Sequence, residues 1–354
     1  MRHCLRDFEG DWPDHHRATT RQLPSRSLEI GKTPHFTREA RVESHALDEL
    51  DQRFLHILQL DARAPFARIA DQLGVSETTI ARRYQRLRGL GLRISGQPVP
   101  ARLGLTRWLL RLHTVPHAAT TIAEALARRS DSSWVTIASG GTEICCAVTT
   151  RSRHERDVLL LEKLPRTPQV TAVSAHCLLH MFTGASSTWH ATRFGSGPLS
   201  GDPDTPLPPV TLDATDHALL DQLAPDGRAP LAQLAAATGR STSTIQRRLE
   251  RLRDTGAIGF AVDFDHELLG YRLSARLWLR VSPAHLRTVG KALATHPEIP
   301  FAAATTGPSN IVASGIFRDP HDLYRYTDQQ LGPLPIDAFE TAPILRDVKR
   351  LTTA

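Results

Sequence analysis

The chain has 354 residues, a formal net charge of +6 and a sequence isoelectric point of about 9.5, and 40% of its residues are hydrophobic. This length is too great for one small core and allows roughly two to four compact domains. No stretch reaches the roughly 18 consecutive apolar residues of a membrane span and the N-terminus lacks an apolar signal core, so we expect a cytoplasmic protein without a membrane partner. The mild positive charge suits a nucleic-acid partner but does not prove one.

The N-terminal residues 1–45 are polar and lack hydrophobic periodicity, which predicts a disordered extension. An alternative start codon could encode Val42, so residues 1–41 need not be translated. Residues 185–209 are rich in Gly, Pro and Ser and are expected to form a linker.

A sequence repeat sets the predicted architecture. The segment Leu47–Gly91 aligns with Leu212–Gly256 at an offset of 165 residues without a gap, and about 21 of the 45 aligned positions are identical. Chance would give only a few identities, so we interpret the two segments as a duplication.

Each copy predicts a helix-turn-helix. The first amphipathic helix is expected at Asp51–Leu60 and at Asp216–Leu223, and the second should begin at a proline, Pro65 or Pro230. A glycine then ends the second helix and a serine caps the third. These are Gly74 with Ser76 in the first copy, and Gly239 with Ser241 in the second.

The third helix of each copy points to DNA. At about 100° per residue, one stripe is apolar and faces the core; it comprises Ile80, Tyr84 and Leu87, or Ile245, Leu249 and Leu252. The free face carries arginines, hydroxyls and amides, which can bond to base edges in the major groove or to phosphates. The expected DNA-binding residues are Ser76, Thr78, Arg82, Arg83, Gln85, Arg86, Ser241, Ser243, Gln246, Arg247, Arg248 and Arg251.

After each copy the order strand-helix-strand-strand-helix-strand recurs. The first set is expected at Arg107–Val115, Ala118–Arg129, Trp134–Ser139, Glu143–Thr149, Arg153–Leu164 and Val170–Leu179. The second set is expected at Leu273–Val281, Ala284–His296, Phe301–Thr306, Ile311–Phe317, Pro320–Leu331 and Ile336–Leu345. This βαββαβ order is ferredoxin-like, and its sheet leaves one face free to pack on a partner.

The predicted fold class is therefore α+β, in two tandem units of a winged or plain helix-turn-helix domain followed by a ferredoxin-like sensor domain. The expected boundaries are 46–97 and 98–184 for the first unit, and 210–262 and 263–354 for the second.

The head motifs resemble the Lrp/AsnC, or feast/famine, family of bacterial and archaeal regulators. They are Leu47-Asp48-x-x-Asp51, Asp61-x-Arg63-Ala64-Pro65 and Gly74-x-Ser76-x-x-Thr79-Ile80-x-Arg82-Arg83-x-x-Arg86-Leu87, with Gly91 closing the segment and the same pattern at Leu212–Gly256. The tandem form looks like the duplicated regulators of high-GC actinobacteria. The resemblance implies a transcriptional regulator that binds double-stranded DNA and whose sensor sheets pair. One chain would then form an intramolecular pseudo-dimer, and a higher homo-oligomer stays open.

The resemblance also implies a site for a small effector, often an amino acid, near the turn between the two central strands. That turn usually has an aspartate three positions after a glycine. Here the turns read Gly140-Gly141-Thr142-Glu143 and Gly307-Pro308-Ser309-Asn310, so both copies replace the aspartate. These eight residues are the expected effector site, with altered recognition of an α-amino group; a plain tight turn is the alternative.

Three other functions have weaker support in the sequence. Sirohaem decarboxylases look similar in fold, but their central turn tends to carry histidine and neither turn here does.

His176, Cys177 and His180 are close in sequence but alternate across a strand, so we expect no metal site. Cys145 and Cys146 are expected to be buried strand residues, with a redox switch as the alternative. We expect no cofactor and no catalytic residue, since no nucleophile elbow or phosphate-binding glycine loop occurs.

Overall fold

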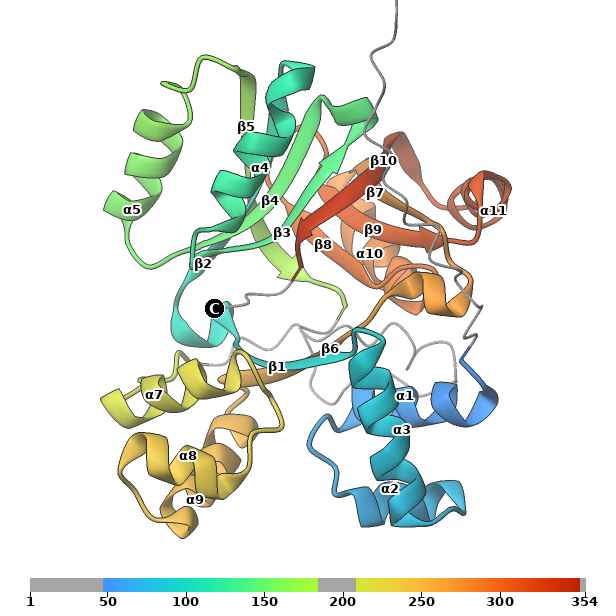
Figure 1. The fold of residues 1–354 in the computed structure, drawn as a ribbon. Helices are drawn as coiled ribbons and strands as arrows, with labels where there is room; N and C mark the ends of the chain where they lie inside the picture. Colours follow the sequence, from blue (N-terminus) through green and yellow to red (C-terminus); the bar gives the residue numbers. More distant parts are fainter. Residues whose placement is uncertain (1–46, 184–207, 351–354) are drawn as a thin grey trace, which may run out of the picture. The chain divides into compact units, whose positions relative to one another are not determined.

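The computed structural model describes residues 47–183 and 208–350. The expected extension, 1–45, lies outside the described residues, and so does the expected linker, 185–209, apart from its last two residues. The described chain comprises two three-helix domains, here called head 1 and head 2, and a sheet to which both sensor units contribute (Figure 1).

Each head contains the three helices that its sequence predicts. Head 1 has α1 (Glu49–Leu60), α2 (Phe66–Leu73) and α3 (Glu77–Gly89), and head 2 has α7 (Ala214–Leu223), α8 (Leu231–Thr238) and α9 (Thr242–Asp254). The expectation that Pro65 and Pro230 begin the second helices is wrong by one residue. Both prolines are N-caps with ψ of 141° and 145°, so their backbone is extended and the helix begins after them.

The core of each head takes in residues from the opposite repeat. Phe54 and Ile80 of head 1 share one buried cluster with Val262 and Phe264, which follow head 2 in the chain. The core of head 2 similarly receives Leu103, which follows head 1. Each head is therefore packed against the segment that leaves the other head.

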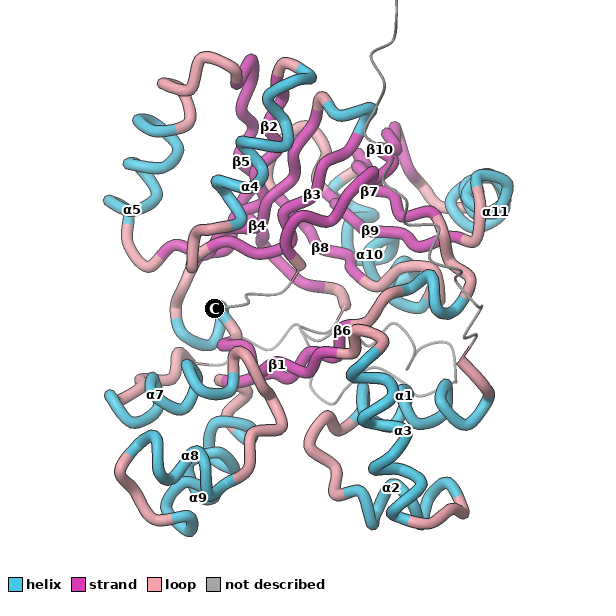
Figure 2. Tube along the Cα trace, viewed as in Figure 1, coloured by secondary structure: helices cyan, strands magenta, loops and turns pink. Residues whose placement is uncertain are grey.

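The strand that follows each head pairs with the strand that follows the other head. The sequence analysis missed both strands. Strands β1 (Arg93–Pro98) and β6 (Ile258–Asp263) pair antiparallel, with Ser95 opposite Ala261 (Figure 2). Six paired residues in a two-stranded sheet give little hydrophobic alternation to detect, because the partner lies in the other repeat.

The sensor units have the expected βαββαβ order. In the first unit the elements are β2 (Thr106–Thr114), α4 (Ala119–Ala127), β3 (Ser132–Ala138), β4 (Glu143–Thr150), α5 (Arg153–Asp157) and β5 (Val170–Met181). In the second they are β7 (Leu273–Val281), α10 (Leu286–Thr295), β8 (Phe301–Thr305), β9 (Ile311–Phe317), α11 (Pro320–Tyr326) and β10 (Ile336–Lys349). The half-sheets run β3-β4-β2-β5 and β8-β9-β7-β10, which is the ferredoxin-like strand order in both.

The two half-sheets join at both edges into one closed eight-stranded barrel (Figure 1). The order is β10-β3-β4-β2-β5-β8-β9-β7, closed by pairing of β7 with β10. Strand β5 of the first unit pairs with β8, and β10 of the second pairs with β3. Each unit thus lends its last strand to the other, and the barrel leaves neither half-sheet with an unpaired edge.

Alternation along the strands separates the two faces of the barrel. Leu110 and Leu112 of β2 pack outward under α4 and the segment after α5, and Leu277 and Leu279 of β7 pack outward under α10 and α11. Inward-facing residues form a separate cluster that includes Leu109, Cys145, Ala147 and Trp278, together with Ala303 and Val312. The helix-free faces of the two sheets therefore cover each other inside the barrel.

Several element boundaries differ from the sequence expectations. The helices expected at Arg153–Leu164 and Pro320–Leu331 are α-helical only over α5 and α11 and continue as wider π-helical turns, Val158–Lys163 and Thr327–Leu331. Strand β10 runs to Lys349 rather than Leu345, because its second half pairs with β3 of the other unit.

Candidate nucleic-acid interface

The turn before each third helix has the geometry that its glycine and serine predict. Gly74 lies at φ 68° and Gly239 at φ 64°, in the left-handed region that glycine adopts without strain. The side chain of Ser76 accepts the backbone N–H of Thr79 at 3.2 Å, and Ser241 accepts that of Thr244 at 3.3 Å. Both expected N-caps are therefore confirmed, and each satisfies a backbone donor in the first turn.

The two faces of α3 and α9 also divide as expected. Ile80, Tyr84 and Leu87 are buried in head 1, and Ile245, Leu249 and Leu252 are buried in head 2. The expected DNA-binding residues lie on the opposite side. They are exposed in ten positions, Ser76, Thr78, Arg82, Gln85, Arg86, Ser241, Ser243, Gln246, Arg247 and Arg251, and half-buried at Arg83 and Arg248.

Two of the arginines on α3 bind aspartates at the start of α1. Asp48 and Asp51 form a capping box, and the Asp51 side chain is fully buried. Arg83 donates to Asp48 at 2.6 Å and to Asp51 at 2.8 Å, and Arg86 donates to the second oxygen of Asp51. The third helix is therefore held to the first by charge-assisted hydrogen bonds around one buried carboxylate.

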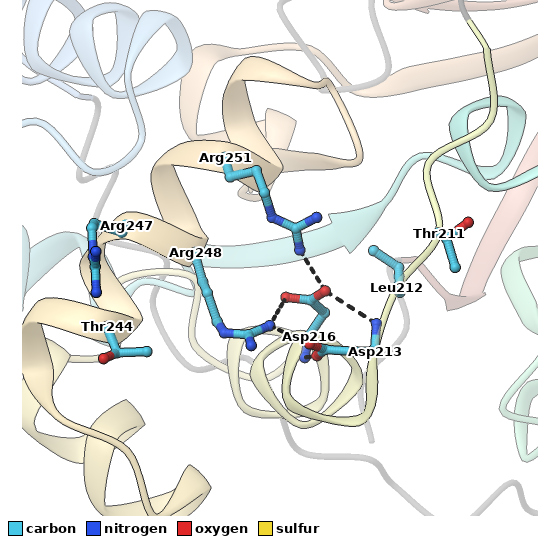
Figure 3. A pocket seen from close by; sticks show the side chains of 8 residues that line it. All are labelled: Thr211, Leu212, Asp213, Asp216, Thr244, Arg247, Arg248 and Arg251. Carbon is cyan, nitrogen blue, oxygen red and sulfur yellow. Dashed lines mark hydrogen bonds and ion pairs between the residues drawn. The ribbon is translucent and has the colours of Figure 1, made fainter.

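Head 2 repeats this arrangement (Figure 3). Arg248 donates to Asp213 at 2.6 Å and to Asp216 at 3.0 Å, and Arg251 donates to the other oxygen of Asp216. Arg247 lies on the same helix but is drawn without a contact to either aspartate. We call these two arrangements the aspartate clamps: Asp48, Asp51, Arg83 and Arg86 in head 1, and Asp213, Asp216, Arg248 and Arg251 in head 2.

The aspartate clamps lower the pKa of Asp48 and of Asp213, the N-cap residues of α1 and α7. The backbone N–H of Asp216 and the Arg248 guanidinium hold the pKa of Asp213 below its ordinary value. Burial alone would raise the pKa of Asp48, but hydrogen bonds from Arg83 and from the backbone of Asp51 outweigh it and the pKa is lowered. Both carboxylates therefore stay ionised at neutral pH.

Arg82 and Arg247 differ from the clamp arginines. Both are exposed, and neither makes an ion pair with any residue in 47–183 or 208–350. The amides on the two helices also differ. Gln85 is exposed on α3, whereas Gln246 on α9 donates to Glu250 at 3.0 Å. The free hydrogen-bonding capacity of the two helices is thus not the same.

A reciprocal exchange of arginines joins the two heads, and sequence analysis did not find it. Arg63 of head 1 donates to the backbone carbonyls of Gly227 and Ala229 in head 2. Arg228 of head 2 donates to the carbonyls of Ala62 and Ala64 at 2.6 and 2.9 Å. Two outer ion pairs follow the same symmetry, Arg253 with Asp61 and Arg88 with Asp226.

The two arginines of this exchange also lie over aromatic rings. The Arg228 guanidinium lies 4.6 Å from the ring centre of Phe66, and Arg63 lies 5.9 Å from that of Phe260. The sequence analysis named Arg63 only as part of a family motif. The residues next to Arg63 in the sequence do not indicate that it binds a loop of the other repeat. These contacts join the two heads directly.

The expected effector turns are occupied by contacts within the chain. Glu143 is buried, and its carboxylate accepts from Arg111 at 3.0 Å and from the Ser139 hydroxyl at 3.1 Å. In the second turn both groups of the Asn310 side-chain amide bond to the backbone of Val281. The other expected residues are Gly140, Gly141 and Thr142, and Gly307, Pro308 and Ser309; they lie in the connections between β3 and β4 and between β8 and β9.

The cysteine and histidine residues singled out from the sequence take structural positions. Cys145 and Cys146 are fully buried in β4, as expected. On β5, His176 is buried beside Trp278, with ring centres 5.0 Å apart, and its Nδ1 is 2.8 Å from the Thr306 carbonyl oxygen. Within the described residues no group of three metal-ligating side chains converges.

Comparison with known proteins supports this assignment of heads and sensors. Residues 47–88 and 212–253 match the AsnC-type helix-turn-helix domain, and residues 274–354 match the Lrp/AsnC ligand binding domain. The HTH-type transcriptional regulator FL11 of Pyrococcus horikoshii is 32% identical over 145 residues, 40% of this chain and 95% of the relative. An HTH-type transcriptional regulator of Mycobacterium tuberculosis is 27% identical over 142 residues, 39% of this chain and 94% of the relative.

A structural comparison covers both units at once. The siroheme decarboxylase NirDL has a TM-score of 0.60 at 14% identity, over 86% of this chain and 93% of that protein. At this identity the likeness concerns the fold alone.

Two further results bear on the kind of protein. Each helix in the described part of the chain is too short or too polar to cross a bilayer. The chain spans almost the whole of FL11 at 32% identity, and both of its heads match one domain type. The chain therefore belongs to the Lrp/AsnC family of transcriptional regulators, in a tandem form that carries the helix-turn-helix twice.

Proposed function

We propose that this regulator recognises specific sites in double-stranded DNA by placing α3 and α9 in the major groove. The observation that supports it best is the pair Arg82 and Arg247. They occupy equivalent positions, are exposed, and have no intramolecular ion pair among the described residues. An arginine in a groove can donate two hydrogen bonds to guanine, which makes it the commonest base-specific contact.

The clamp arginines have a different role in this proposal. Arg83, Arg86, Arg248 and Arg251 fix the angle of the third helix on its head, since each is bonded to a carboxylate. Arg86 and Arg251 remain about two-fifths exposed, so they also lie within reach of phosphates at the groove edge. The serine and threonine hydroxyls and Gln85 and Gln246 complete the base-reading surface.

We also propose that the chain is a regulator without catalytic activity, acting in the cytoplasm where its DNA lies. The fold is shared with a decarboxylase, but the heads keep the turn, the cap and the exposed arginine of a DNA-binding domain in both copies. Incubation with sirohaem should release no carbon dioxide; release with turnover would reverse this part of the proposal.

The proposal includes a small effector that acts through the sensor domains. The turns at Gly140–Glu143 and Gly307–Asn310 stay a predicted contact site. Because Glu143 and Asn310 are already bonded within the chain, an effector there would contact the backbone of the turns rather than these two side chains.

The decisive experiment is selection of bound fragments from the source genome by the purified chain, followed by binding measurements on the recovered sites. If each head contacts about three phosphates, the logarithm of the affinity should fall with the logarithm of salt concentration with a slope of about −5. Absence of any specifically bound fragment, or a salt-independent affinity, would refute the proposal.

A further inference from the structure

A partly open cavity of about 450 Å³ lies between the barrel strands, Gln59 and residues 262–267, and the two predicted effector turns do not line it. Inward-facing residues of both sensor units form its wall, among them Trp134, Phe301 and two arginines, Arg107 and Arg276. Trp134 has a φ of 53°, which is rare for a large side chain, at an irregularity in the pairing of β3 with β4. The rest of the lining is mixed, because aromatic and aliphatic residues share it with further charged ones, including Asp263 and Asp347, which both pair with Arg350.

Arg276 is the feature that points to a ligand. Its side chain is only 5% exposed, and its one hydrogen bond is from Nη1 to the Ser314 hydroxyl. Its Nε has no acceptor in the described part of the chain, and neither has that of Arg107, whose Nη2 is 3.3 Å from the Ser133 hydroxyl. A guanidinium buried without an anion is unfavourable, so Arg276 is a candidate partner for the anionic group of a ligand.

The other half of the same barrel shows what such an arginine binds. Arg111 on β2 and Arg276 on β7 both lie on the inner face of the barrel, the face that carries Leu109 and Trp278. Arg111 donates to the carboxylates of Glu143 and Glu340 and lies 4.9 Å from the ring centre of Trp278. An inward arginine in this barrel is thus satisfied by carboxylate groups beside an aromatic ring.

Strand register shows which residue stands beside Arg276 where a carboxylate stands beside Arg111. Arg111 stands opposite Cys145 and Arg276 opposite Ser314, so Val312 has the same register relation to Arg276 that Glu143 has to Arg111. A hydrophobic residue therefore lies beside Arg276 at this place, and Arg276 forms no ion pair with the described residues.

We propose that this cavity binds a small organic carboxylate with an apolar body. The carboxylate accepts hydrogen bonds from Arg276 and Arg107, in the place that Glu143 takes beside Arg111, and the apolar body packs against Trp134 and Phe301. A carboxylate is the anion that the inward-facing Arg111 binds in the same barrel, and the aromatic and aliphatic part of the lining suits an apolar body.

The position of the cavity couples this ligand to the heads. Gln59 of α1 lines it, and so do residues 262–267, which end β6 and follow it. Those same residues carry Val262 and Phe264, which belong to the core of head 1. A ligand in the cavity therefore contacts the segments that hold head 1, and its effect on DNA binding rests on the proposed function, whereas its binding does not.

The full chain should be titrated with acetate, hexanoate, 3-phenylpropionate and indole-3-acetate, followed by calorimetry and tryptophan fluorescence. The larger acids should bind saturably with one site per chain, at least about tenfold more tightly than acetate or 3-phenylpropionamide. Failure of all four acids to bind overturns the inference. So does equal competition by inorganic phosphate, because it would indicate a general anion site.

Two variants test the role of Arg276. Arg276→Gln should abolish carboxylate binding without lowering the Tm of the ligand-free chain, since a buried unpaired charge is removed; a lower Tm with binding intact would mean a structural role. Val312→Glu should supply the missing internal partner, raise the Tm and block binding. If Val312→Glu binds carboxylates as before, the inference is wrong. The matched control is Arg280→Gln, an exposed arginine on the same strand, which should change neither quantity.

Specific DNA binding by each variant separates the two proposals. A chain that shifts its genomic site but binds none of the acids overturns this inference and leaves the proposed function standing. A chain that binds the acids but no specific DNA overturns the proposed function and leaves this inference standing.

Discussion

At the scale of single residues, the arginines on the third helices fall into two kinds that the sequence does not distinguish. All are compatible with a DNA-facing stripe, but Arg83, Arg86, Arg248 and Arg251 bind the aspartate clamps, whereas Arg82 and Arg247 are exposed and unpaired within the described chain. The spacing Asp48-x-x-Asp51 predicts a capping box from local rules. The ion pairs across 35 residues depend on how the helices pack, which no local pattern contains.

Removing an arginine that we propose to contact bases should weaken specific binding without affecting the fold. Arg82→Ala and Arg247→Ala should each cost about 1–3 kcal/mol of binding free energy on the natural site and much less on unrelated DNA. Fluorescence anisotropy with both DNAs measures the difference. Arg128→Ala, an exposed arginine in the first sensor unit, is the control and should bind like the parent. Equal losses on both DNAs would assign these arginines to phosphates instead.

Removing the buried carboxylate of a clamp should destabilise the protein. Asp216→Ala leaves Arg248 and Arg251 without their shared partner and removes the capping contact, so we expect a loss of about 2–3 kcal/mol in the free energy of unfolding. Urea unfolding followed by circular dichroism checks this. Asp221→Ala, an exposed aspartate on the same helix, should stay within about 0.5 kcal/mol of the parent. A similar effect of both substitutions would contradict a structural role for the clamp.

The clamps also predict acid sensitivity. The pKa of Asp213 is lower in the folded chain than its ordinary value, so its ionised form stabilises the fold above that ordinary value, near pH 4. This contribution is lost as the pH falls through the folded-state pKa. Asp213→Asn keeps a capping side chain but not the charge. Its Tm should lie below that of the parent at pH 7, and the two should begin to converge near pH 4 and meet once the pH is below the folded-state pKa of Asp213. A difference that persists at low pH would be due to packing.

At the scale of elements, the sequence predicted what local rules specify. The predicted helix ends lie close to the observed ones because Gly74, Ser76 and their equivalents act on neighbouring residues. The sensor strands were predicted correctly because inward and outward residues alternate along them. The pairing of β1 with β6 and the arginine exchange were missed because both partners lie in opposite repeats. The sequence also left Arg276 unnoticed, since its burial in the barrel depends on how the strands of the two units pack.

The arginine exchange should set the spacing of the two half-sites on DNA. Arg63→Ala combined with Arg228→Ala removes the four donated hydrogen bonds between the heads, so the heads should tolerate a wider range of separations. Affinity measured on sites whose half-sites are separated by successive single base-pair insertions should show a sharp optimum for the parent and a broad one for the variant. Arg53→Ala, exposed in head 1, should keep the sharp optimum. An unchanged profile in the double variant would place the spacing constraint elsewhere.

At the scale of the whole molecule, duplication has preserved the scaffold and altered the reading surface. The glycine, the cap and the exposed arginine recur in both heads, but Ala81 is matched by Gln246 and Gln85 by Glu250. In head 2 these two side chains bond to each other, at 3.0 Å between Gln246 Nε2 and Glu250 Oε1. Head 2 therefore offers a joined amide and carboxylate where head 1 offers a methyl group and an amide.

This divergence predicts a DNA site that is not a perfect palindrome. A homodimer with identical heads binds best to a two-fold symmetric site, whereas differences between heads are worth about 1–3 kcal/mol per base pair. The natural site should therefore bind more tightly than either symmetric site built from one of its halves. Competition among the three DNAs measures this. Gln246→Ala with Glu250→Gln makes head 2 resemble head 1 at these positions and should reduce the preference. A symmetric site that binds as well as the natural one would show that one head dominates recognition.

The closure of the barrel through β5 with β8 and β3 with β10 has a consequence for the quantity of protein in a cell. A regulator assembled from separate subunits loses its paired form on dilution, so promoter occupancy falls more steeply than copy number. Here both halves belong to one polypeptide, and their association does not depend on concentration. If one chain is the unit that binds DNA, as the proposed function has it, occupancy well below saturation should follow copy number in simple proportion, down to the few molecules present after a cell divides.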